Sequence, residues 1–182
     1  MINNKIKYIT TISIFASIIC IISPISINIG IIPLSFSLFS IYIIGALSKK
    51  WMSLIATMVY IFIGIIGLPV FSNFNGGIGI ILGPTGGYII SYIPCVIIVS
   101  LITNINKNKI ILYPIGMIIG TIIVYLFGSL WFMFQTDNNF YQSLIITVVP
   151  FIFFDLIKII LASICSYMIN NKTPYQEMIK SI

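Results

Sequence analysis

The chain has 182 residues, of which 59% are hydrophobic and 7% are charged, and its mean hydropathy is +1.17. A typical soluble domain has about 25% charged residues, which form the polar shell that this chain lacks. The composition therefore excludes a water-soluble fold and predicts an all-α integral membrane protein with one membrane domain over residues 1–182.

Uncharged stretches set the number of membrane spans. No charged residue falls within 8–48, 51–106 or 110–136. A helix needs about 20 apolar residues to cross a bilayer, so the first stretch fits two helices, the second fits two helices and a long loop, and the third fits one. A sixth span follows if Asp155 and Lys158 are tolerated inside it. The expected spans lie near 8–24, 33–48, 51–68, 83–103, 111–134 and 143–169.

The lysines occupy alternate connections between these spans. Three connections, at 25–32, 69–82 and 135–142, contain no lysine. Eight of the nine lysines lie before the first span, after the sixth, or in the two remaining connections: Lys5, Lys7, Lys49, Lys50, Lys107, Lys109, Lys172 and Lys180. The positive-inside rule then predicts a cell-membrane protein with both termini cytoplasmic. A cleaved secretion signal at the amino terminus would spoil this alternation, and no small-residue cleavage site follows it.

The residue inventory excludes several kinds of chemistry. The chain has no His and no Arg, and its acids are Asp137, Asp155 and Glu177. A Ser–His–Asp hydrolase, a zinc or di-iron centre and a P-loop ATPase all need residues that are missing. We therefore expect no enzyme, no metal and no cofactor, and any energy for transport must come from a partner. The net charge of +6 does not indicate a nucleic-acid partner, because the lysines are spread along the chain.

A glycine-rich outer loop connects the third and fourth spans. Residues 67–87 hold seven glycines and two prolines, which predicts a loop folded back over the helices. The motif Gly83-Pro84-Thr85-Gly86-Gly87-Tyr88 then opens the fourth span. Backbone N–H groups from Thr85 to Gly87 would lie at the positive end of the helix dipole, where they could hold an anionic group of a ligand. Alternatively, these glycines pack the helix against the loop.

Two charged residues lie inside the sixth span. Asp155 and Lys158 are three residues apart, so they share one helix face. Each costs roughly 2.5–3.5 kcal/mol at a membrane helix centre unless it is paired or faces a hydrated cavity. A carboxylate accepts hydrogen bonds and an ammonium donates them, so the pair suits a neutral urea or amide ligand. A purely structural ion pair is the alternative.

Small residues form a stripe on the first span. Ser13, Ala16, Ser17 and Cys20 recur at helical spacing, which allows another helix or a partner subunit to approach closely.

Two motifs resemble the BioY family, the biotin-binding S components of energy-coupling-factor (ECF) transporters. They are LPVFSNFNGGIGIILGPTGGY at 68–88 and FFDLIK at 153–158, supported by IPLSF and GAL around the second span. The resemblance implies a six-helix protein that captures biotin from outside, with a membrane coupling subunit and two cytoplasmic ATPases as partners. It also implies ligand contacts for Asn75, Asp155 and Lys158, and matches Tyr88 to the tyrosine that ends the loop motif.

Three positions depart from the family pattern. Ile89 stands where some relatives have an Arg that can meet the biotin carboxylate, which leaves the helix amides, Thr85 or Lys158 for that role. Ser37 aligns with a frequent Gln. The family's Ala-x-x-x-Ala docking motif for the coupling subunit corresponds to Ala16-x-x-x-Cys20.

These observations combine into a hypothesis of biotin capture. We expect the ureido ring of biotin to contact Asp155 and Asn75, and the loop at 69–82 to close over the ligand. The alternatives are an S component for another vitamin and an accessory membrane subunit without a ligand. An intramembrane enzyme acting on a lipid lacks a base and a metal site.

Overall fold

The computed structural model describes residues 4–28 and 33–172, and most of these residues are helical. The long helices of this part are α1 (Asn4–Ile22), α2 (Ser37–Leu47), α3 (Lys50–Ile66), α5 (Gly86–Thr103), α6 (Leu112–Thr136) and α8 (Ile152–Lys172). Shorter elements are β1 (Ser26–Asn28), β2 (Pro33–Ser35), the 3-10 helix η1 (Ser72–Phe74), α4 (Ile78–Leu82) and α7 (Phe140–Thr147).

Within the described part of the chain, four helices are long and apolar enough to cross a membrane: α1, α5, α6 and α8. The shorter helices α2 and α3 are also apolar and have 11 and 17 residues. Large apolar side chains are exposed on the surface, including Phe62, Phe127 and Phe153, each more than half exposed. Such a surface suits contact with lipid and explains why the chain lacks a polar shell.

The helix boundaries differ most from the expected spans in two places. The start of the predicted 33–48 span is not helical, because residues 33–35 form β2 and pair antiparallel with β1. The predicted single helix over 143–169 is two helices, α7 and α8, separated by a turn at residues 148–151. Pro150 lies in that turn and has no N–H to donate, so it accounts for the interruption.

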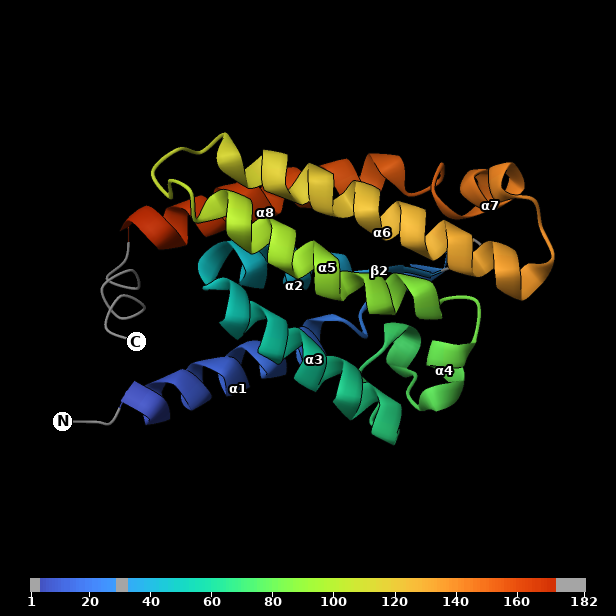
Figure 1. Cartoon of the computed structure of the whole chain (residues 1–182), viewed down its shortest axis with the longest axis horizontal. Helices are drawn as coiled ribbons and strands as arrows, with labels where there is room; N and C mark the ends of the chain where they lie inside the picture. Colours follow the sequence, from blue (N-terminus) through green and yellow to red (C-terminus); the bar gives the residue numbers. More distant parts are fainter. Residues whose placement is uncertain (1–3, 29–32, 173–182) are drawn as a thin grey trace.

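Helices α5 and α6 lie side by side along most of their lengths (Figure 1). A Cβ atom at Gly120 of α6 would lie 2.8 Å from the Cys95 sulfur of α5, so glycine is what allows this close approach. Helix α8 packs on α2 and α6, while α1 packs on α3 and α2. The core between them is apolar and includes the fully buried Tyr42, Tyr60 and Tyr113.

The lysine-bearing segments gather at one end of the bundle, at the left in Figure 1. This end holds the start of α1, the α2–α3 and α5–α6 connections, and the end of α8. Two hydrogen bonds tie these segments together: the Asn104 side chain donates to the Ser48 carbonyl at 3.0 Å, and that of Asn171 donates to the Lys107 carbonyl at 3.1 Å. Lys180 of the predicted pattern lies outside the described residues.

Candidate functional site

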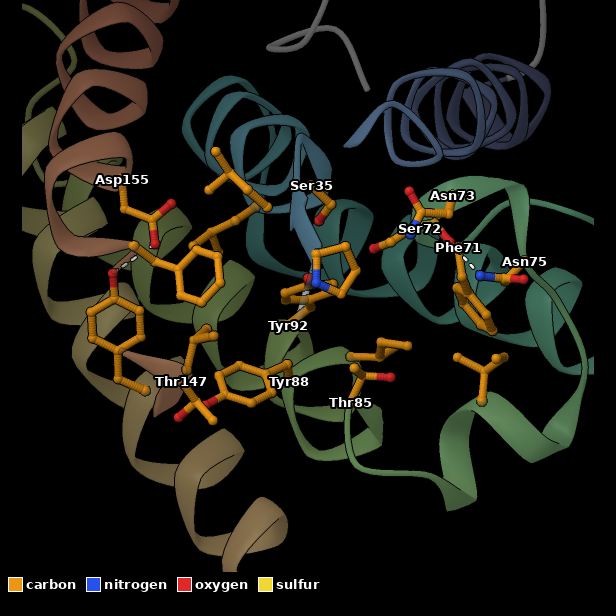
Figure 2. A pocket seen from close by; sticks show the side chains of 18 of the residues that line it. Ser35, Phe71, Ser72, Asn73, Asn75, Thr85, Tyr88, Tyr92, Thr147 and Asp155 are labelled. Carbon is orange, nitrogen blue, oxygen red and sulfur yellow. Dashed lines mark hydrogen bonds between the residues drawn. The ribbon is translucent and has the colours of Figure 1, made fainter. Parts of the chain in front are cut away.

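A cavity of about 310 Å³ lies between β2, the α3–α5 connection, α5, α6 and the start of α8 (Figure 2). Its volume falls at the lower end of the range of about 300–1,000 Å³ that is usual for small-molecule sites. Most of its wall is apolar or aromatic and comprises Pro33, Leu34, Leu38, Phe71, Ile80, Tyr88, Ile89, Tyr92, Val124, Tyr125 and Phe151. Such a wall suits a compact and largely apolar ligand.

The charged pair predicted on the last span lies in the cavity wall. The Lys158 ammonium is 2.9 Å from Asp155 Oδ1, and both side chains are nearly buried. Asp155 is in the first turn of α8, where the helix dipole favours a negative charge. The structure thus places two opposite charges, close together, against a space that can hold a ligand.

Two further groups complete a polar cluster around this pair. The Tyr125 hydroxyl donates to Asp155 Oδ2 at 2.6 Å, and the Lys158 ammonium donates to the Ser35 carbonyl at 2.8 Å. We call these four residues the charged cluster. Sequence reasoning missed Tyr125 and Ser35. A tyrosine in an apolar helix was the available signal, since its hydroxyl needs a partner when it is buried.

The opposite end of the cavity carries uncharged polar groups. Asn73 has left-handed backbone geometry (φ 59°), and its side-chain amide donates to Asn28 Oδ1 at 2.8 Å. The Asn75 amide donates to the Ser72 carbonyl at 3.0 Å. Figure 2 shows Asn75 and Asp155 at opposite ends of the cavity. The expected contact of one ureido ring with both side chains stays a prediction.

Of the GPTGGY residues, Thr85 and Tyr88 line the cavity, whereas Gly86 and Gly87 do not. A Cβ at Gly86 would overlap the Ile81 carbonyl, and one at Gly87 would overlap the Trp131 side chain. The Gly86 N–H already donates to the Gly83 carbonyl at 3.1 Å, so it is not available to an anion. The geometry favours the packing role for these two glycines.

Ser37 lies next to the cavity without lining it. Its buried hydroxyl accepts a hydrogen bond from the Ser35 hydroxyl at 3.0 Å, and it is 3.4 Å from the Ser23 carbonyl. Ser37 thus stabilises the end of β2 through its hydrogen bond with Ser35. Ser37, which aligns with a frequent Gln of the family, is absent from the cavity lining.

The two predicted docking residues on α1 are not equally accessible. Ala16 is buried in the core of the chain, and Cys20 is half-buried. Ser13 and Ser17 of the same stripe are exposed. The outward face of α1 therefore presents Ser13 and Ser17 among exposed isoleucines, while Ala16 packs inward.

No group of three His, Cys, Asp or Glu side chains gathers within the described ranges 4–28 and 33–172. The charged cluster consists of one carboxylate, one ammonium, one phenol and one carbonyl. This donor set suits hydrogen bonding to a neutral polar ligand.

Comparisons with known proteins agree with this architecture. The model of the BioY family matches residues 1–175. The biotin transporter BioY2 of Lactococcus lactis subsp. cremoris is 32% identical over 162 residues, which cover 89% of each chain. A probable biotin transporter BioY of Pyrococcus horikoshii is 30% identical and covers 93% of this chain and 99% of its own.

A solved structure has the same fold. It is the crystal structure of an S component for biotin from an ECF-type ABC transporter, with a TM-score of 0.86 and 26% sequence identity. The match covers 98% of this chain and 99% of that one. From the family match, these relatives and this structural similarity, we conclude that the chain belongs to the BioY family.

Proposed function

We propose that this chain is the substrate-capture subunit for biotin uptake, energised by partner ATPases. The observation that carries the proposal is the charged cluster at one end of a cavity whose wall is mostly apolar. Biotin has a matching division, with a polar ureido ring at one end and a carboxylate on an aliphatic tail at the other. Relatives named as biotin transporters, together with the structural similarity to an S component for biotin, support the assignment.

The charged cluster holds the ureido ring. The ring N–H groups donate to the Asp155 carboxylate, and the ring carbonyl accepts from the Lys158 ammonium, which has a third donor beyond its bonds to Asp155 and Ser35. The aliphatic tail lies along the apolar wall of α5 and the α3–α5 connection. No covalent bond of biotin is made or broken, so the chain acts as a transporter subunit rather than as an enzyme.

The α3–α5 connection forms the cover of the site. Its contacts to the rest of the bundle include a bond from the Trp131 indole to the Gly83 carbonyl at 2.9 Å and one from the Asn73 N–H to the Pro24 carbonyl at 3.1 Å. Asn73 also forms hydrogen bonds with Ser26 and Asn28. Biotin enters from outside when this cover lifts, and closure excludes water from the charged cluster.

Six helices, α1, α2, α3, α5, α6 and α8, span the cell membrane in this proposal, with both termini cytoplasmic. The lysines at one end of the bundle mark the cytoplasmic side. A membrane coupling subunit and two cytoplasmic ATPases complete the transporter. The exposed stripe of Ser13 and Ser17 gives α1 a face on which a coupling helix can pack closely.

Cysteine labelling tests this topology. Asn108 lies in the α5–α6 connection and Gln135 in the last turn of α6, and both are exposed. In a background without the native Cys20, Cys95 and Cys165, a membrane-impermeant maleimide added to whole cells should label Gln135→Cys and not Asn108→Cys. Disrupted cells should give labelling of both. Labelling of Asn108→Cys and not of Gln135→Cys in whole cells would contradict the proposed orientation.

Calorimetric titration of the detergent-purified protein tests the ligand. Biotin should bind with nanomolar to micromolar affinity, while riboflavin and thiamine should not bind. The Tyr125 hydroxyl already donates to Asp155 Oδ2 within the protein itself, so Tyr125→Phe should lower stability by about 1.5–3 kcal/mol. Because the carboxylate is then less firmly positioned for the ureido ring, biotin binding should weaken by about tenfold. A folded protein that binds no biotin would contradict the proposal. It would favour another vitamin if one of those binds, or an accessory subunit if none does.

A further inference from the structure

The charged side chains that line the cavity lie at one end of it, and their opposite charges cancel. Among the described residues that line it, Asp155 and Lys158 are the only charged ones. They are 2.9 Å apart, so the cavity wall has no net charge. Charge balance matters for a ligand because a buried ion without a counter-charge costs several kcal/mol.

The Lys158 ammonium is not positioned as a counter-ion for a ligand carboxylate. It bonds to Asp155 Oδ1 and to the Ser35 carbonyl, and it lies 5.9 Å from the centre of the Phe36 ring. Moving it onto a second carboxylate would leave two buried acids to share one cation. The remaining described lysines lie in segments at the far end of the bundle (Figure 1).

The other end of the cavity offers hydrogen bonds without charge. Its polar groups include Asn73, Asn75 and Thr85. A side-chain amide or a hydroxyl both donates and accepts, so it pairs with a carboxamide as well as with a carboxylate. Asn73 and Asn75 are also exposed, so this end of the cavity reaches the surface.

From this distribution of charge we infer that the site does not require the negative charge of biotin, and that it also takes biotin derivatives whose carboxyl group is blocked as an amide. The inference rests on the proposed function and names its substrate class more widely: free biotin, biotinamide and biotin joined to a lysine side chain. In each of these ligands the ureido ring binds to the charged cluster. The blocked tail ends among neutral groups, and a longer tail leaves the cavity beside Asn75.

Calorimetry on the wild-type chain tests the inference with biotin and biotinamide as the two ligands. Their dissociation constants should agree within about tenfold, which corresponds to about 1.4 kcal/mol. Biotinamide binding weaker by more than a hundredfold, with biotin binding intact, would overturn the inference and leave the proposed function standing. Failure of biotin itself to bind would overturn the proposed function, so the two failures are distinguishable.

A pair of variants at Thr85 supplies a second test. Thr85→Lys adds a cation at the neutral end and should create a preference for biotin over biotinamide of at least about tenfold. Thr85→Met adds similar length without charge, and its ratio between the two ligands should stay at the wild-type value whatever its absolute affinity. If wild type and Thr85→Met both prefer biotin as strongly as Thr85→Lys does, a charge already present in the site selects the carboxylate and the inference fails.

Discussion

Replacing Asp155 by Asn is expected to weaken biotin binding by at least about a hundredfold and to destabilise the protein by about 3–5 kcal/mol. The substitution leaves the Lys158 ammonium buried without its counter-charge, and it removes the carboxylate that accepts hydrogen bonds from the ureido ring. Lys158→Met should have effects of similar size, since it leaves the Asp155 carboxylate unpaired. Thermal unfolding in detergent and biotin titration measure the two effects separately.

The double variant Asp155→Asn/Lys158→Met decides between a structural and a ligand-binding role for this pair. With both charges gone, no buried charge is left unpaired, and an Asn at 155 can still accept the Tyr125 hydrogen bond. Thermal stability should therefore return close to the wild-type value, while biotin binding stays lost. A double variant that regains both stability and biotin affinity would show that the pair serves the fold alone.

Gly86→Ala should destabilise the protein by about 1–3 kcal/mol and weaken biotin binding as well. The added Cβ would overlap the Ile81 carbonyl, and backbone cannot move aside as a flexible side chain does. Helix α4 must then shift away from α5, which displaces Ile80 from the cavity wall. Unfolding temperature and biotin affinity, measured side by side, test this chain of effects.

Gly79→Ala is the matched control for this prediction. Gly79 lies in α4, and a Cβ built there meets no atom within 4 Å. The same chemical change should therefore leave the affinity for biotin unchanged, and it should hold or slightly raise stability because alanine restricts the unfolded chain. Equal behaviour of the two variants would mean that the contact between α4 and the start of α5 does not shape the site.

Much of the cavity could be predicted because buried charge is costly wherever it occurs in a membrane helix. Asp155 and Lys158 stand out in an apolar run, and their spacing alone places them on one face. Both line the cavity, as do Thr85, Tyr88 and Asn75 of the glycine-rich loop. By contrast, Tyr125 resembles any aromatic residue of its helix until the rotation of α6 against α8 is known.

Local sequence could not reveal contacts that depend on distant segments. Strand β2 forms because β1 lies opposite it, and Ala16 is buried because α1 packs on α2 and α3. Whether Gly86 and Gly87 face a ligand or a neighbour depends on where Ile81 and Trp131 lie. Each of these contacts depends on residues that are far apart along the chain or on the path that a loop takes.

By itself, the sequence determined that this protein belongs in a membrane, that its lysines alternate between connections, and that a carboxylate and an ammonium share one face of its last helix. These properties follow from composition and periodicity, which act through transfer free energy and local helix geometry. The packing of the helices settles which groups surround that pair, and it leaves the described residues at the opposite end of the cavity without charge. Those properties depend on how the helices pack and on where the α3–α5 connection folds over them.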